Sequence, residues 1–173
     1  MFLKNRLSGT ALIALFLITV SNVNIMSRGP STAEERAKAL TIIRSLEVNP
    51  IQDGYKEKRK WLMDWLNELP DISIKVCREF LDEMQEEGNG RHYGVEIYLQ
   101  SIFSSAAFII EHPEKSKDKV AIYEAGLRGS LKVYSFLLSK DPLARRQYLD
   151  DMVEKERNGQ LTEVARLAIR NCI

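Results

Sequence analysis

The sequence has few of the residues that build most metal sites. Its 173 residues include only two cysteines and two histidines. Neither a Cys-x-x-Cys nor a His-Glu-x-x-His spacing occurs. His92 and Glu96 stand four apart, but they lack the third ligand that a catalytic zinc needs. We therefore expect no metal and no cofactor.

The motifs of the common nucleophilic and phosphate-binding enzymes are also missing. The chain has no G-x-S-x-G elbow, no Walker loop and no G-x-G-x-x-G after a predicted strand. The acids Asp150, Asp151 and Glu154 fall within a predicted helix and not within a calcium-binding loop. We predict that the protein is not an enzyme. A hydrolase whose catalytic residues are scattered along the chain is the alternative.

The chain carries little excess charge, since its formal net charge is +1. A nucleic-acid partner normally requires a basic excess or stripe, so we predict none. Residues 56–60 are mostly basic and precede Trp61, but Glu57 and Asp64 dilute their charge. Leu62, Trp65, Leu66 and Leu69 form the apolar face of the predicted helix, and we expect Trp65 in the core. Trp61 is offset from this face. We therefore treat it as a candidate surface contact.

The N-terminus resembles a secretory signal peptide. A short basic start precedes the apolar stretch Ala11–Val20, which is shorter than the ~20 residues that span a bilayer. We predict a signal peptide in residues 1–27, a single domain in residues 28–173, and a secreted or periplasmic location. Because no charge occurs between Arg6 and Arg28, a retained N-terminal anchor is the alternative, and only then would the protein meet a membrane.

One long segment without charge organises the predicted fold. Ile97–Ile110 has no charged side chain in a chain that is 28% charged, which is typical of a helix that other helices cover. Small residues on this helix and on the next one predict close packing of the two. We expect an all-α, single-domain bundle of about six or seven helices around a central apolar helix hairpin. The small residues are Ser101, Ser104, Ser105, Ala106 and Ala107 on the first helix and Ala125, Gly126, Gly129 and Ser130 on the second.

Capping residues and helix breakers predict the ends of the other helices. Ser31 and Glu34 have the spacing of a capping box at the start of the first helix. A third helix is predicted to be capped by Asp71 or Ser73 and to bury Cys77 on its apolar side. Thr162 is predicted to cap the last helix.

The two cysteines, Cys77 and Cys172, are predicted to form a disulfide. An exported chain meets an oxidising compartment, and an even cysteine count leaves no thiol over. The bond would pin the last helix, and the chain-entropy model assigns roughly 4–5 kcal/mol to closing so long a loop. Two buried thiols that are too far apart to bond are the alternative.

Aromatic side chains on the two central helices are the candidate ligand contacts. They can line a pocket for an apolar small molecule, or they can simply fill the core. A cavity of a few hundred Å³ would favour a carrier, and histidines and acids that converge in a cleft would favour an enzyme. An exposed apolar patch together with no cavity would favour a protein binder. The candidate residues are Phe103, Phe108, Tyr123, Tyr134 and Phe136.

Several segments resemble small exported bacterial helical proteins that are themselves uncharacterised: PDISIKVC, AAFIIEHPEKS, YEAGLRGSLKVY and the terminal RNC. The resemblance implies export and a helical fold, and it implies no activity, cofactor or functional residue. Our leading hypothesis is an exported, non-catalytic helical protein that binds another protein in the cell envelope or the extracellular medium. A carrier of a small apolar ligand between helices is the alternative. The sequence leaves the protein partner and the oligomeric state open.

Overall fold

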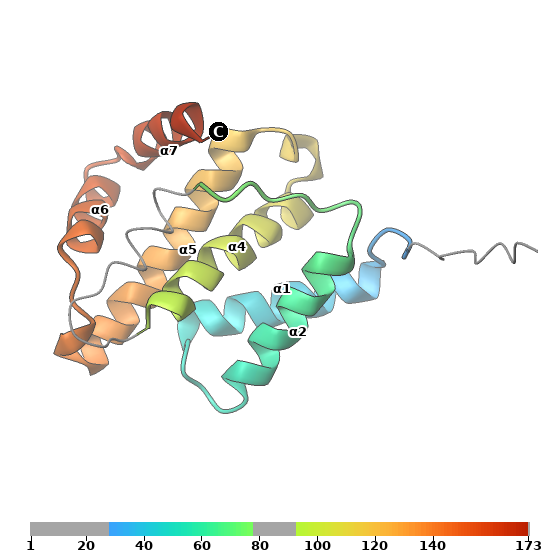
Figure 1. The fold of residues 1–173 in the computed structure, drawn as a ribbon, viewed down its shortest axis with the longest axis horizontal. Helices are drawn as coiled ribbons and strands as arrows, with labels where there is room; N and C mark the ends of the chain where they lie inside the picture. The colour runs from blue at the N-terminus through green and yellow to red at the C-terminus, as the bar shows by residue number, and fades with distance from the viewer. Residues whose placement is uncertain (1–27, 78–92, 173) are drawn as a thin grey trace, which may run out of the picture.

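The computed structural model describes residues 28–77 and 93–172, and in this part of the chain it contains six α-helices and no strand (Figure 1). The predicted all-α class is confirmed. The predicted signal peptide lies outside the described residues. None of the helices in these two ranges is both long and apolar enough to cross a membrane. The helices are α1 (Ala33–Val48), α2 (Tyr55–Glu68), α4 (Gly94–Glu111), α5 (Lys119–Lys140), α6 (Gln147–Arg157) and α7 (Leu161–Asn171), with short 3-10 turns η1 (Pro113–Lys115) and η2 (Pro142–Ala144).

Helices α4 and α5 approach each other closely at two buried glycines. A Cβ atom added at Gly126 would lie 2.7 Å from the carbonyl oxygen of Ser101. A Cβ atom added at Gly129 would overlap the side chain of Ser104. Only glycine therefore fits at these positions, because any side chain would push the two helix axes apart.

Two serine hydroxyls bridge the same pair of helices. Ser105 Oγ donates to the carbonyl oxygen of Ile122 at 3.0 Å, and Ser130 Oγ donates to the carbonyl oxygen of Ile97 at 2.8 Å. Later residues of α4 thus contact earlier residues of α5, so the two helices run antiparallel. Each hydroxyl is buried and satisfied, as a polar group inside a helix interface needs to be.

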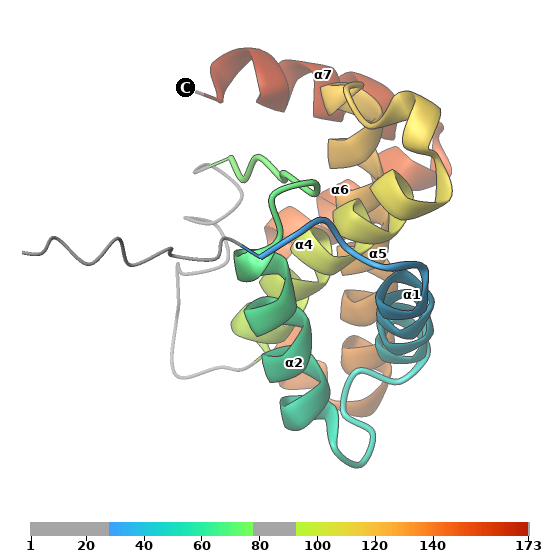
Figure 2. The same cartoon turned by 90° about the vertical axis from the view of Figure 1, so that its right-hand side faces the viewer.

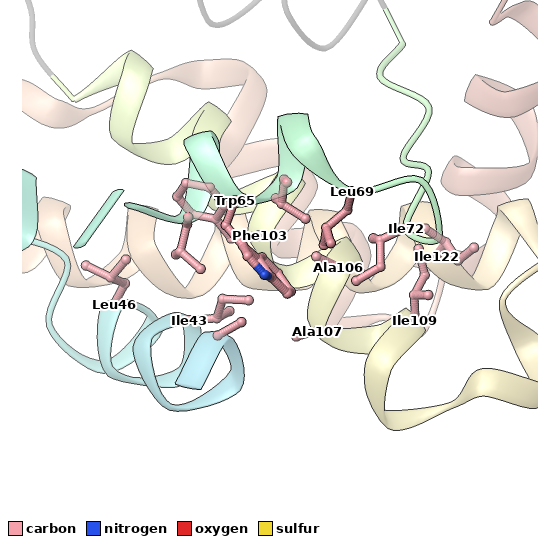
Figure 3. Packing of buried hydrophobic residues seen from close by; sticks show 13 residues of the cluster. Ile43, Leu46, Trp65, Leu69, Ile72, Phe103, Ala106, Ala107, Ile109 and Ile122 are labelled. Atoms are coloured by element: carbon pink, nitrogen blue, oxygen red, sulfur yellow. The ribbon is translucent and has the colours of Figure 1, made fainter. Parts of the chain in front are cut away.

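The remaining helices bury apolar residues against this pair in two clusters. Figures 1 and 2 show α1 and α2 on one side of it, and α6 and α7 on the other. The first cluster includes Ile43, Trp65 and Phe103, which Figure 3 shows from close by. The second cluster includes Leu131 and Leu149. Trp65 is 4% exposed, which agrees with its prediction as a core residue.

The predicted capping box of α1 is wrong by one residue. The N-cap is Thr32, whose hydroxyl accepts from the Glu35 backbone N–H, and the Glu35 carboxylate accepts from the Thr32 N–H. Ser31 instead donates to the distant Asp71 through both its backbone N–H, at 3.0 Å, and its hydroxyl, at 2.7 Å. A tertiary contact therefore takes Ser31 out of the local cap.

The prediction of a third helix is wrong for the part of it that the structure describes. Residues 71–77 form an irregular, non-helical segment, and the rest of that prediction lies outside the described residues. Apolar and polar residues alternate from Ile72 to Val76, and β-branched side chains favour extended backbone. Ile72 and Cys77 are buried, whereas Val76 is exposed.

The predicted cap of the last helix is also wrong. Helix α7 begins at Leu161, and its N-cap is Gln160, whose side chain makes no capping bond. Thr162 lies inside the first turn and is exposed. Gly159 has φ +71°, a left-handed conformation that glycine adopts without strain, and it turns the chain so that Leu161 is fully buried. Burial of Leu161 thus decides where the helix begins.

Candidate ligand-binding site

A cysteine pair joins the segment after α2 to the end of α7. Cys77 and Cys172 are disulfide-bonded, with Cα atoms 5.1 Å apart, as predicted. Such a pair is compatible with an extracellular or periplasmic location. The bond holds residues 72–77 beside the C-terminal end of α7.

The same two segments are joined by a side chain. Lys75 Nζ donates to the carbonyl oxygen of Cys172 at 3.1 Å. Ile72, at the other end of the segment, is 7% exposed and packs in the first core cluster. In Figure 1, residues 72–77 are the green irregular segment that crosses near the upper end of α5. The segment is thus anchored at both ends and forms a wall against α5.

Between this wall, the start of α5 and the end of α7 lies an open pocket of about 610 Å³. Four of its lining residues are apolar or aromatic and buried or half-buried. The other five are exposed and polar, and three of these are lysines. The first set is Ile74, Ile122, Tyr123 and Ile169, and the second is Ser73, Lys75, Ser116, Lys117 and Lys119.

The lysines of this pocket have no acidic counterpart in its lining. None of the lining residues is Asp or Glu. Asp118 stands between two of the lysines, but its Oδ1 accepts from the Ala121 backbone N–H at 3.0 Å and caps α5. Within the described residues, no ion pair joins Lys75, Lys117 or Lys119 to a carboxylate. The pocket therefore combines an apolar floor with a cationic rim.

A second hollow, of about 700 Å³, lies between α5 and α6. The polar groups on its floor already form hydrogen bonds with one another. Tyr134 OH donates to Asp150 Oδ1 at 2.7 Å and accepts from the Arg146 backbone N–H at 3.1 Å. Asp150 also pairs with Arg145 at 2.8 Å. Burial raises the pKa of Tyr134 to about 12. These bonds fasten the α5–α6 connection to α5, so we assign them a structural role.

A buried carboxylate joins α1 to the α4–α5 pair. Glu47 Oε1 accepts from Ser104 Oγ at 2.8 Å and from Arg44 Nη1 at 2.6 Å, while its Oε2 accepts from Lys132 Nζ at 3.0 Å. Gln100 Nε2 donates to Ser104 Oγ at 3.0 Å. Ser104 is 2% exposed, and the carboxylate to which it donates is already neutralised by Arg44 and Lys132. We therefore interpret Ser104 and Glu47 as a structural bridge, and not as a catalytic nucleophile with its general base.

Arg59 is a second buried charge and secures the α1–α2 loop. Its Nη2 donates to the carbonyl oxygen of Pro50 at 2.9 Å, and its guanidinium lies 4.9 Å from the ring centre of Tyr55. Burial lowers the pKa of Arg59, and the negative charge of Glu96 opposes that change. Within the described residues, no group of three or more His, Cys, Asp and Glu side chains is placed to hold a metal ion.

The structure does not bring the five predicted pocket aromatics together. Phe103 and Phe108 pack in the first core cluster. Tyr134 and Phe136 pack in the second. Only Tyr123 lines the pocket at the start of α5.

Trp61, the candidate surface contact, is half-buried. It stacks on Trp65 with ring centres 5.7 Å apart, and Lys38 Nζ lies 4.0 Å from the centre of the Trp61 ring. The indole is thus covered by an aromatic ring and an ammonium group. Figure 3 places Trp65 beside Phe103 in the core.

Sequence reasoning missed the rim of the pocket. Lys117 and Lys119 belong to a charged stretch that reads as a solvated turn, and their spacing in the run KSKDK was the one available signal. Nothing local predicts that Lys75 or Ile169 lies beside them. The expected Cys77–Cys172 bond is the one prediction that brings the segment around Lys75 close to the end of the last helix, where Ile169 lies.

Comparison with known proteins identifies no relative of this chain. No family model, no curated protein and no solved structure matches the chain. The function is therefore inferred from the chemistry of the pocket.

Proposed function

We propose that the protein is an exported, non-catalytic carrier that binds one small molecule with an apolar part in the pocket between residues 73–75, the start of α5 and the end of α7. The observation that supports this role is the pocket of about 610 Å³. Ligand sites usually measure about 300–1,000 Å³ and combine apolar walls with a few polar groups. An open pocket of this size favours the carrier over protein binding, which is the leading hypothesis from the sequence alone.

Export of the carrier is supported by two features. The N-terminal order of basic, apolar and polar residues is typical of a signal peptide. The Cys77–Cys172 bond suits an oxidising compartment and closes one end of the pocket wall. A carrier in the periplasm or the medium would bind an apolar molecule that water dissolves poorly.

We also infer that the described helices form one bundle organised around the α4–α5 pair. The close approach at Gly126 and Gly129 supports this arrangement, as do the apolar clusters on the two sides of the pair. In such a bundle the start of α5 is held rigidly by α4. Ile122 and Tyr123 are therefore fixed parts of the pocket floor.

Protein binding is the second candidate, because three large apolar side chains are strongly exposed. Val48 is 75%, Val95 66% and Leu143 74% exposed. They come from the end of α1, the start of α4 and η2, and none of them lines the pocket. A binding partner that covers them would leave the pocket free.

The carrier function can be tested with the uncharged fluorophore N-phenyl-1-naphthylamine, which brightens in apolar sites. We expect saturable binding by the wild type and at least tenfold weaker binding by Ile169→Trp, because the indole would fill the pocket. Leu167→Trp is the matched control, since Leu167 lies on the same helix, is 46% exposed and does not line the pocket. If all three proteins bind the probe equally, or none does, the carrier function is wrong.

A further inference from the structure

The rim of the pocket carries positive charge that no ion pair neutralises within the described residues. Lys75, Lys117 and Lys119 come from two segments that are far apart in the sequence, and all three are exposed. Of the described carboxylates near them in the sequence, Asp71 binds Ser31 and Arg36, Asp118 caps α5, and Glu114 lies 3.6 Å from the imidazole of His112. Within residues 28–77 and 93–172, an anion at the rim would therefore meet three ammonium groups and no acid in the lining of the pocket.

One of these ammonium groups is already held in place. Lys75 Nζ donates to the Cys172 carbonyl oxygen, and that residue is bonded through its sulfur to Cys77. An ammonium group has three donors, so this hydrogen bond leaves two that residues 28–77 and 93–172 do not engage. Anchoring lowers the side-chain entropy that Lys75 would lose on binding an anion.

The floor beneath the rim suits an alkyl chain. Ile122 is 8% exposed, and Ile74 and Ile169 are half-buried. Isoleucine side chains offer no hydrogen bond, so they favour a ligand portion that needs none. Ser73 and Ser116 add hydroxyl groups only on the exposed side of the pocket. Polarity thus changes along the pocket from the rim to the floor.

We infer that the ligand is a single-chain amphiphile with an anionic head, which the three rim lysines bind while the alkyl tail lies over the isoleucine floor. This inference rests on the proposed carrier function. Lysine acts as a point charge and does not require the planar geometry that arginine favours, so both carboxylate and phosphate heads fit the rim. A cationic head would be repelled, and a neutral one would gain nothing from the lysines.

The test is displacement of bound N-phenyl-1-naphthylamine by three ligands with the same tail, all below their micelle-forming concentrations: dodecanoate, dodecyl phosphate and dodecyltrimethylammonium. We expect at least one of the two anions to displace the probe at about tenfold lower concentration than the cation, which corresponds to about 1.4 kcal/mol. The anion that displaces the probe at the lower concentration identifies the head group. The preference should shrink in concentrated salt, because exposed charges are screened.

Two triple variants with the same net charge separate the rim from the rest of the surface. Lys75→Gln/Lys117→Gln/Lys119→Gln should bind all three ligands alike. The control Lys→Gln triple at three exposed lysines outside the pocket should keep the preference for anions. The control positions are Lys56, Lys115 and Lys140.

The outcomes distinguish this inference from the function on which it rests. If the wild type binds the probe and all three ligands displace it equally, the carrier function stands and the head-group inference is wrong. The inference is also wrong if the preference for anions survives in the rim triple variant. If the probe does not bind, the carrier function is overturned, and the head-group inference that rests on it is overturned as well.

Discussion

Replacement of Gly129 by alanine should destabilise the protein, although alanine is the better helix former. The added Cβ atom would overlap Ser104 and would lie 3.5 Å from Glu47 Oε1. In an open helix the substitution would stabilise by ~1 kcal/mol. Here the overpacking costs about 1–3 kcal/mol, and a displaced Ser104 hydroxyl would leave the buried Glu47 short of a donor at a further cost of about 1–3 kcal/mol.

The balance of these effects is a net loss of about 1–5 kcal/mol, and Gly129→Leu should lose more. For a domain of this size, the loss lowers the melting temperature by about 2–20 °C. Thermal and urea unfolding, followed by far-ultraviolet circular dichroism, measure both quantities. Gly29→Ala is the control, because a Cβ atom at Gly29 would meet nothing within 4 Å. It should change stability by less than about 0.5 kcal/mol.

The cause of the loss can be assigned to Ser104. In a Ser104→Gly background the overlapping atoms are absent, so Gly129→Ala should cost clearly less than in the wild type. A melting temperature for Gly129→Ala equal to or above that of the wild type would refute the close contact between α4 and α5. Equal costs in the two backgrounds would show that Ser104 is not the obstacle.

Two further predictions concern the pocket wall and the buried tyrosine. Cys172→Ser should lower the unfolding free energy by up to about 4–5 kcal/mol. It should also weaken probe binding, because the segment that carries Lys75 is then no longer bonded to the end of α7. Unchanged binding would show that the disulfide does not shape the pocket. Tyr134→Phe should cost about 1 kcal/mol at neutral pH, because it removes the hydrogen bond to Asp150. The folded-state pKa of Tyr134, about 12, is above the unfolded value near 10, so the proton is bound more tightly in the folded protein. Wild-type stability should therefore fall relative to Tyr134→Phe as the pH rises from about 10 to 12, and parallel stability curves of the two proteins would contradict this assignment.

The features that sequence reasoning predicted correctly depend on composition and on local periodicity. Ile97–Ile110 lacks charge because the helix is covered, and the structure places this segment in α4. The Leu62/Trp65/Leu66 stripe has helical spacing, and these residues are buried in α2. The pairing of Cys77 with Cys172 followed from their even count and the expected compartment.

The features that it missed depend on contacts between distant residues. The cap of α1 moved by one residue because Ser31 bonds to Asp71, which lies 40 positions away. Residues 71–77 are not helical, because burial of Ile72 in the first core cluster and the bond from Cys77 to Cys172 override the weak helical pattern. The pocket joins three separate parts of the chain, so no single stretch of sequence contains its pattern. From the sequence alone, Lys117 and Lys119 are typical of a solvated turn. They form a cationic rim only because the fold brings Lys75 to the same pocket.

The most direct test of the carrier function is a crystal structure of the protein grown with 12-bromododecanoate. The anomalous signal of bromine locates the end of the alkyl tail without any assumption about the binding site. We expect the bromine over the floor formed by Ile74, Ile122 and Ile169, with the carboxylate within hydrogen-bonding distance of the lysines at the rim. A pocket that contains only water, or bromine bound solely elsewhere on the surface, would contradict the proposed function.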